Sequence, residues 1–325
     1  MFLEGTQIVV DEKPFCVWEI DQKQSNVRFI KNIDPTYFKY IADMHYSVFQ
    51  NEKESEFHQH AALSIRINYS HALETFFAFL FASIQAPDCI SGWLQKYSLK
   101  DLEGLIEKIS KRKKILSKFK MENSSWESIS RIVFNHVVLK NQEQSDNYKN
   151  QFAILWKRLS SDFINKNIRQ EYNSLKHGFR ITPGGFGLAF GLQDAPDIPA
   201  PPERMQSLGY SKYGSTFPIE ENIRTNEPSF RIKRHSRNWD IENFLHGVNL
   251  ISMSLSNIQS FLKIVNGTNP SDCKFNYPTE IEYFDEPWKR IVGINDSSID
   301  MQINIDDVPV CRKKDVLEYY NKLTT

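Results

Sequence analysis

The sequence predicts an α+β fold in which a helical bundle dominates and a small β-sheet accompanies it. Residues 57–85 contain neither proline nor glycine, and apolar residues nearly surround the second half of this stretch, which is typical of a buried helix. Residues 241–265 show the same apolar helical pattern. Both ends of the chain carry short runs rich in Val, Ile and Phe. Because chain ends commonly lie near each other, we expect the N-terminal and C-terminal segments to build one small sheet.

The first half of the chain divides into a β segment, 1–34, and a helical bundle, 35–180. The β segment contains the strand-like runs QIVV, FCVWEI and NVRFIKNI, which polar turn residues separate. In the bundle, the spacing of apolar residues and the positions of capping residues and prolines predict helices. The expected helices cover residues 36–52, 57–85, 99–120, 126–140 and 148–177.

The second half begins with a Gly/Pro-rich insertion, 181–230, for which we expect a hairpin with GLAFG as one arm. Residues 231–266 supply a strand, RIKRHSRNW, and the closing bundle helix, which Asp240 caps and Asn266-Gly267 ends. The last segment, 267–325, is predicted to be β-rich, with strands at EIEYF, KRIVGI and MQINIDDVPV and a terminal helix over 313–323.

The composition excludes several classes of protein. Since 40 Lys and Arg residues balance 40 Asp and Glu residues, a generic polycation that coats nucleic acid is excluded, although one local basic surface is not. The four cysteines are widely spaced, which argues against a cysteine-based zinc site and against a disulfide framework. The most apolar run, 76–84, is too short to span a bilayer, and the N-terminus lacks a basic leader region. We therefore expect a cytoplasmic protein with reduced cysteines and no membrane contact.

A polar constellation lies at the end of the 148–177 helix. Arg169, Asn173 and His177 follow one another at intervals of four residues, so they share one helix face, and Arg180 lies three residues further on. A histidine can move a proton and an arginine can hold a phosphate, and RNA cleavage by 2′-hydroxyl attack needs this pair. The structural alternative is a plain helix C-terminus, because His177 complements the helix dipole and Gly178 suits a left-handed cap.

The string EYNSLKHGFR at the end of this helix, together with SHALETFFAFLFASIQAP in the 57–85 helix, resembles the HEPN superfamily (higher eukaryotes and prokaryotes nucleotide-binding domain). The resemblance covers at most residues 36–265. It implies an up-and-down helical bundle that is frequently a homodimer and uses no metal or other cofactor. Many such proteins are endoribonucleases in toxin–antitoxin or antiviral defence systems, and others are binding modules.

The sequence departs from the catalytic motif of that family in its spacing. Seven residues separate Arg169 from His177, which is more than in the family motif, and this favours a degenerate member. The preferred hypothesis is therefore a module that binds RNA, a nucleotide or a protein partner. Two alternatives stay open. One is an active metal-independent endoribonuclease with His177, Arg169 and Asn173 as catalytic residues. The other is a non-catalytic scaffold whose Gly/Pro-rich insertion and small sheet hold a protein partner.

Two further sets of residues are candidate ligand-binding groups. His71 and Glu74 share one face of the 57–85 helix, where they could meet the polar stripe across the bundle. Histidine and glutamate are also metal-ligand types, but this pair alone is a weak metal signal and no metal site is expected. The second set alternates along the predicted strand and forms one basic face, which could follow a nucleic-acid backbone or simply protect an edge strand. Its members are Arg231, Lys233, His235 and Arg237.

Overall fold

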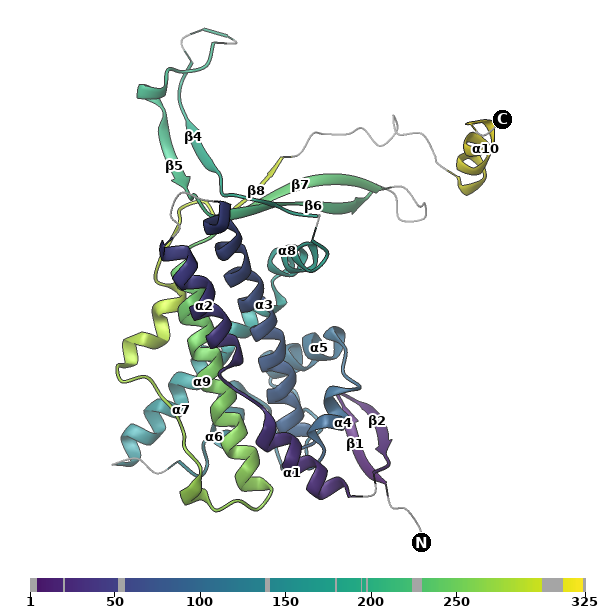
Figure 1. Ribbon diagram of the computed structural model, residues 1–325, viewed down its shortest axis with the longest axis vertical. Helices are drawn as coiled ribbons and strands as arrows, with labels where there is room; N and C mark the ends of the chain where they lie inside the picture. The colour runs from purple at the N-terminus through teal and green to yellow at the C-terminus, as the bar shows by residue number, and fades with distance from the viewer. Residues whose placement is uncertain are drawn as a thin grey trace. The chain divides into compact units, whose positions relative to one another are not determined.

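The computed structural model describes residues 5–19, 21–51, 56–137, 141–178, 180–193, 195–196, 198–223, 230–299 and 312–323. The chain divides into two compact units (Figure 1). Unit 1 comprises Met1–Arg169 and Ile241–Arg290, and unit 2 comprises Gln170–Asp240 and Ile291–Thr325. Helices dominate and the sheets are small and antiparallel, which confirms the mainly helical α+β class.

Unit 1 is a helical bundle with an N-terminal hairpin. The hairpin pairs β1 (Thr6–Val10) with β2 (Lys13–Val17). The bundle helices are α1 (Gln22–Asn32), α2 (Tyr37–Asn51), α3 (Glu56–Gln85), α4 (Ile90–Leu94), α5 (Leu99–Ser110), α6 (Trp126–Val133), α7 (Gln142–Ile164) and α9 (Ile241–Val265). Two short 3₁₀ helices follow, η2 (Pro270–Asp272) and η3 (Ile281–Trp288), and α8 (Lys166–Lys176) leads out of the unit.

The core of unit 1 lies around α3 and α9, which run side by side with α2 (Figure 1). The second half of α3 is almost fully buried, as its all-round apolar sequence predicted. Its aromatic rings pack on neighbouring helices: Phe76 contacts Trp156 of α7, and Phe77 contacts Trp126 of α6. Such ring pairs add to the stabilisation that the burial of apolar area already provides.

Capping boxes set the N-terminal ends of two bundle helices. Ser125 and Ser128 form a capping box at the start of α6, and Ser98 and Asp101 form another at the start of α5. The predicted helices at 36–52, 57–85 and 241–265 are confirmed in the described residues. Helix α9 ends at Val265, and Gly267, two residues further on, has the left-handed φ of 96° that stops it.

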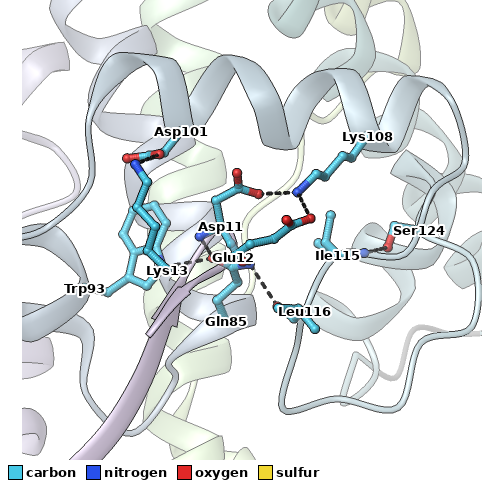
Figure 2. Close-up of polar contacts among 10 residues, drawn as sticks. All are labelled: Asp11, Glu12, Lys13, Gln85, Trp93, Asp101, Lys108, Ile115, Leu116 and Ser124. Carbon is cyan, nitrogen blue, oxygen red and sulfur yellow. Dashed lines mark hydrogen bonds and ion pairs between the residues drawn. The ribbon is translucent and has the colours of Figure 1, made fainter. Parts of the chain in front are cut away.

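The N-terminal hairpin is attached to the bundle through the buried side chain of Gln85, the last residue of α3 (Figure 2). Its Oε1 accepts hydrogen bonds from the Asp11 backbone N–H (2.9 Å) and from Trp93 Nε1 (3.0 Å), and its Nε2 donates to the carbonyl oxygens of Asp11 (3.3 Å) and Leu116 (2.9 Å). Lys108 of α5 adds ion pairs to Asp11 and to the adjacent glutamate. The hairpin turn is therefore fixed to the bundle by these hydrogen bonds and ion pairs.

Several predicted elements differ in the structure. The NVRFIKNI run, predicted as a strand, lies in helix α1, because its buried residues Asn26 and Ile30 are four apart and meet the bundle on one helix face. The predicted 99–120 helix ends at Ser110, where Arg112 takes a left-handed φ of 52°. The 148–177 helix is two helices, α7 and α8, because Asn165 is extended and its side chain caps α8. The 126–140 helix ends at Val133.

Unit 2 contains two antiparallel sheets. The larger has the strand order β3 (Thr182–Pro183), β6 (Gly214–Asn222), β7 (Phe230–Asn238) and β8 (Asp296–Ile299). The smaller is a hairpin of β4 (Gly187–Phe190) and β5 (Gln206–Tyr210), and its first strand is the GLAFG arm that the sequence predicted. The 3₁₀ turn η1 (Pro202–Arg204) and the terminal helix α10 (Lys313–Leu323) complete the unit.

The expected joint sheet of N-terminal and C-terminal strands was wrong for the described residues. The N-terminal strands pair only with each other, and the C-terminal strand β8 pairs with β7. The predicted strand EIEYF lies in η3, because Phe284 and Pro287 are buried three residues apart, which is the 3₁₀ repeat. The KRIVGI run, all of it described, forms no strand, and MQINIDDVPV lies outside the described residues.

Candidate functional site

Helix α8 carries the predicted polar stripe on its outer face. Asn173 and His177 are exposed, and Arg180 is exposed beyond the helix end. Arg169 is partly exposed and forms an ion pair with Glu103 of α5. The arginine that the sequence analysis placed against a phosphate therefore already has a carboxylate partner.

The end of α8 has the left-handed cap that was predicted at Gly178. This glycine has a φ of 66°, and its N–H donates to the carbonyl oxygen of Leu175 at 3.1 Å. Lys176 lies over the ring of Tyr172, 4.2 Å from its centroid. The residues around His177 thus form the plain helix C-terminus that was the structural alternative to a catalytic role.

Sequence reasoning missed the buried carboxylate of Glu171, on the opposite face of α8. Its Oε1 accepts hydrogen bonds from Ser215 Oγ of β6 (2.5 Å) and Trp239 Nε1 (2.8 Å), and its Oε2 lies 3.8 Å from Arg237 of β7. A buried carboxylate needs such donors to offset its lost hydration. The sequence contains one indication that Glu171 is buried. It lies four residues before the apolar Leu175, which places it on the buried face of α8.

Near the start of β7, the basic face is paired with an acid of β6. Arg231 and Lys233 both form ion pairs with Glu221, and the Lys233 Nζ–Glu221 Oε1 distance is 2.9 Å. Hydrogen bonds from Arg231 and then from Lys233 lower the pKa of the Glu221 carboxyl. The glutamate therefore stays ionised and partly neutralises both cations.

Near the end of β7, this face is paired with an acid of β8. His235 Nε2 lies 3.1 Å from Asp296 Oδ1, and Arg237 Nε lies 3.0 Å from the same oxygen. Each of the four basic side chains that the sequence placed on one side of the strand thus has a carboxylate partner. A phosphate group would have to displace these carboxylates. Because Glu221 balances only one of the two charges of Arg231 and Lys233, the face keeps a small positive charge rather than four free cations.

Helix α3 places the remaining two candidates in unit 1. His71 is exposed and packs edge-to-face on the ring of Phe38, with centroids 5.3 Å apart. Glu74 is half-buried. Burial of Tyr97 raises the pKa of its hydroxyl, and the negative charge of Glu74 raises that pKa further. The described residues contain no group of three or more metal-ligating side chains.

The β4–β5 hairpin, residues 187–210, presents large apolar side chains to solvent. Leu188 and Phe190 point to one face of the ribbon, and Tyr210, which pairs with Gly187, points to the other. The exposed fractions are 44% for Leu188, 51% for Phe190 and 68% for Tyr210. The further exposed apolar residues of this hairpin are Leu192, Ile198, Met205 and Leu208.

The base of this hairpin is fixed by a close backbone approach. Gly209 has a φ of 155°, and a Cβ atom at this position would lie 2.5 Å from the Ile294 nitrogen and 3.1 Å from the Gly293 Cα. Only a residue without a side chain fits there. The chain thus holds the base of the ribbon against the 292–294 segment while its apolar side chains remain exposed.

Comparison with family models, with curated proteins and with solved structures gives no significant match. The HEPN resemblance therefore remains a prediction from the residues quoted above. Within the described part of the chain, no helix combines the length and the apolar character that a membrane crossing requires. Cys16, Cys89 and Cys273 are unbridged thiols, and Cys311 lies outside the described residues.

Proposed function

We propose that the chain is a non-catalytic protein-interaction module whose contact element is the β4–β5 hairpin. The observation that carries this proposal is the exposure of Leu188, Phe190 and Tyr210 on the two faces of one ribbon. A two-stranded ribbon buries little apolar surface by itself and is marginally stable in isolation. Contact with a partner surface would remove these side chains from water, which is favourable by about 25 cal/mol per Å².

The charge of the hairpin favours a protein partner over a nucleic acid. Its charged residues are three acids and one base, Asp194, Asp197, Glu203 and Arg204. Nucleic-acid binding depends on several cations that replace the counterions of the phosphates. Protein interfaces instead have an apolar and aromatic centre, which this ribbon provides.

A photoreactive phenylalanine analogue at Phe190 tests the proposal in cells. We expect one discrete light-dependent adduct, which is lost when Leu188→Ser and Tyr210→Ser are added. The matched control carries the analogue at Tyr40 of α2, which is also exposed but lies in unit 1. The adduct mass separates a second copy of this chain, as in the expected homodimer, from another protein. No adduct at Phe190, or the same adduct at Tyr40, contradicts the proposal.

A second candidate function is RNA binding or cleavage at the end of α8, as the resemblance implies. The exposure of Asn173, His177 and Arg180 favours it, because a substrate could reach all three side chains. The test compares wild type with His177→Ala for RNA cleavage, RNA binding and melting temperature. Loss of a measurable RNase activity or of RNA binding at an unchanged melting temperature supports this function. Absence of both activities in the wild type excludes it.

A further inference from the structure

A surface cavity of unit 1 lies outside both of these elements. It has a volume of about 690 Å³ and is walled by α9, by the start of α2 and by residues 276–283. This volume lies within the range of small-molecule sites. Of its three walls, α2 and α9 are helices that pack together in the bundle, and the third is largely irregular chain (Figure 1).

The wall is polar but carries little charge. Among the described residues that line the cavity, the charged ones are Lys39 and Glu280, and the others present hydroxyl groups, amides or apolar groups. Lys39 Nζ already lies 2.6 Å from Asp43 Oδ2 on the next turn of α2. The site therefore has no clustered cations for a phosphate and no clustered acids for a cation.

Hydrogen bonds hold the polar groups of the wall in place. Asn249 Nδ2 donates to the Tyr283 hydroxyl (3.3 Å), and Asn276 Nδ2 donates to Ser256 Oγ (2.8 Å). The backbone of Asn276 is in turn bonded in both directions to the side chain of Asn257, at 2.6 and 2.7 Å. Amides and hydroxyls arranged in this way still offer donors and acceptors to a ligand.

One buried hydroxyl of the wall has an unmade hydrogen bond. Ser252 on α9 is 4% exposed, and its Oγ has no hydrogen-bond partner in the described part of the chain. An unsatisfied buried polar group costs about 1–3 kcal/mol and calls for an explanation. A ligand hydroxyl that reached this Oγ from the cavity would complete the bond.

The wall also includes a partly exposed aromatic residue. Tyr277 lines the cavity and is 41% exposed, and its ring packs against that of Tyr148 with centroids 4.5 Å apart. The wall thus combines two aromatic residues, Tyr277 and Tyr283, with uncharged amide and hydroxyl groups. A sugar ring matches this set because it has hydroxyls around its edge and C–H groups on its faces.

We propose that this cavity binds a neutral mono- or disaccharide. The amides of Asn249 and Asn276 and the hydroxyl of Ser252 contact sugar hydroxyls, and Tyr277 lies against the ring face. A nucleotide is disfavoured because Lys39, the one basic residue of the wall, is paired with an acid. This site is independent of the hairpin and its protein partner.

Ligand-detected saturation-transfer NMR on the full chain tests the proposal, with a panel of neutral mono- and disaccharides and with AMP as the nucleotide probe. We expect at least one saccharide to receive saturation and AMP to receive none. Ser256→Phe places a bulky ring in the cavity beside Ser252 and Asn276 and should abolish the signal, whereas Ser161→Phe, at an exposed position on α7, should retain it. Circular dichroism melting establishes that both variants fold.

Asn249→Ala is a second, milder variant that removes one amide from the wall. Loss of a hydrogen bond to the sugar should weaken binding about tenfold, which corresponds to about 1.4 kcal/mol. The proposal is overturned if no saccharide of the panel binds, if AMP binds and the saccharides do not, or if Ser256→Phe and Asn249→Ala bind as the wild type does.

Discussion

Replacement of Gln85 by leucine should loosen the attachment of the N-terminal hairpin to the bundle. In the native protein this amide accepts hydrogen bonds from Asp11 and Trp93 and donates to the carbonyl oxygens of Asp11 and Leu116 (Figure 2). Leucine has nearly the same size but neither donates nor accepts. The substitution therefore removes four hydrogen bonds without a large change of volume.

The expected loss of stability follows from the groups left behind. The Trp93 side chain is fully buried, so its Nε1–H cannot reach water, and the Asp11 N–H is partly buried. Each orphaned donor costs about 1–3 kcal/mol. The greater apolar character of leucine recovers part of this. We expect the free energy of unfolding of unit 1 to fall by about 3 kcal/mol, a large share of the 5–15 kcal/mol that typically stabilises a domain.

Urea unfolding of the full chain, followed by circular dichroism of the helices, measures this loss. Gln95→Leu is the control, because Gln95 is exposed at the end of α4 and its replacement should change the free energy by less than about 0.5 kcal/mol. Trp93→Phe removes the orphaned donor. The loss in free energy of unfolding that Trp93→Phe causes should therefore be smaller in the Gln85→Leu protein than in the wild type, by about 1 kcal/mol or more.

Two results would refute this reasoning. One is a loss below about 1 kcal/mol in Gln85→Leu, which would mean that water satisfies the donors left by the amide. The other is strict additivity of Gln85→Leu and Trp93→Phe, since it would show that the two side chains do not interact energetically.

Three further predictions concern packing, capping and acid sensitivity. Gly247→Ala should destabilise by about 1–2 kcal/mol in urea unfolding, because its Cβ would lie 2.5 Å from the ring of Tyr69; an unchanged midpoint contradicts this packing. Ser98→Ala should lower the melting temperature by removing the cap of α5, worth about 1 kcal/mol, and Ser98→Thr, which keeps the hydroxyl that donates to Asp101, should restore it. Burial raises the pKa of the Asp101 carboxyl, but hydrogen bonds from Lys13 and Ser98 outweigh it, so the pKa is lowered overall. Its contribution is therefore present above the unfolded-state pKa of about 4 and is lost as the pH falls through the lower folded-state value. Asp101→Asn should make the acid side of the stability profile shallower, and an equal slope in both proteins counts against this.

The parts of the fold that followed from the sequence are those in which local pattern and tertiary burial agree. The helices α3 and α9 have apolar residues on nearly every side, and Gly267 and Gly178 mark helix ends whose backbone is left-handed. The run NVRFIKNI misled because its apolar residues alternate locally, while the contacts of Asn26 and Ile30 with the bundle require a helix. Short apolar runs do not by themselves distinguish the two periods.

The polar sites were harder to predict for a different reason. The spacing of Arg169, Asn173 and His177 correctly gives one helix face, but no local pattern reveals that Glu103 comes from another helix to pair with the arginine. The same holds for the cations of β7, whose acids lie on β6, β8 and α8. Sequence spacing reports which residues share a face, whereas partners distant along the chain depend on tertiary structure.

The interrupted course of unit 1 along the chain has a consequence for its synthesis. Its helix α3 is covered by α9, yet the whole of 170–240, which belongs to unit 2, is made between them. At typical translation rates α9 follows α3 by about 10–30 s. For that time α2, α6 and α7 cover only part of α3, and the side that packs on α9 has no native cover. Binding of a chaperone to this exposed side of α3 would protect the chain until its last bundle helix leaves the ribosome.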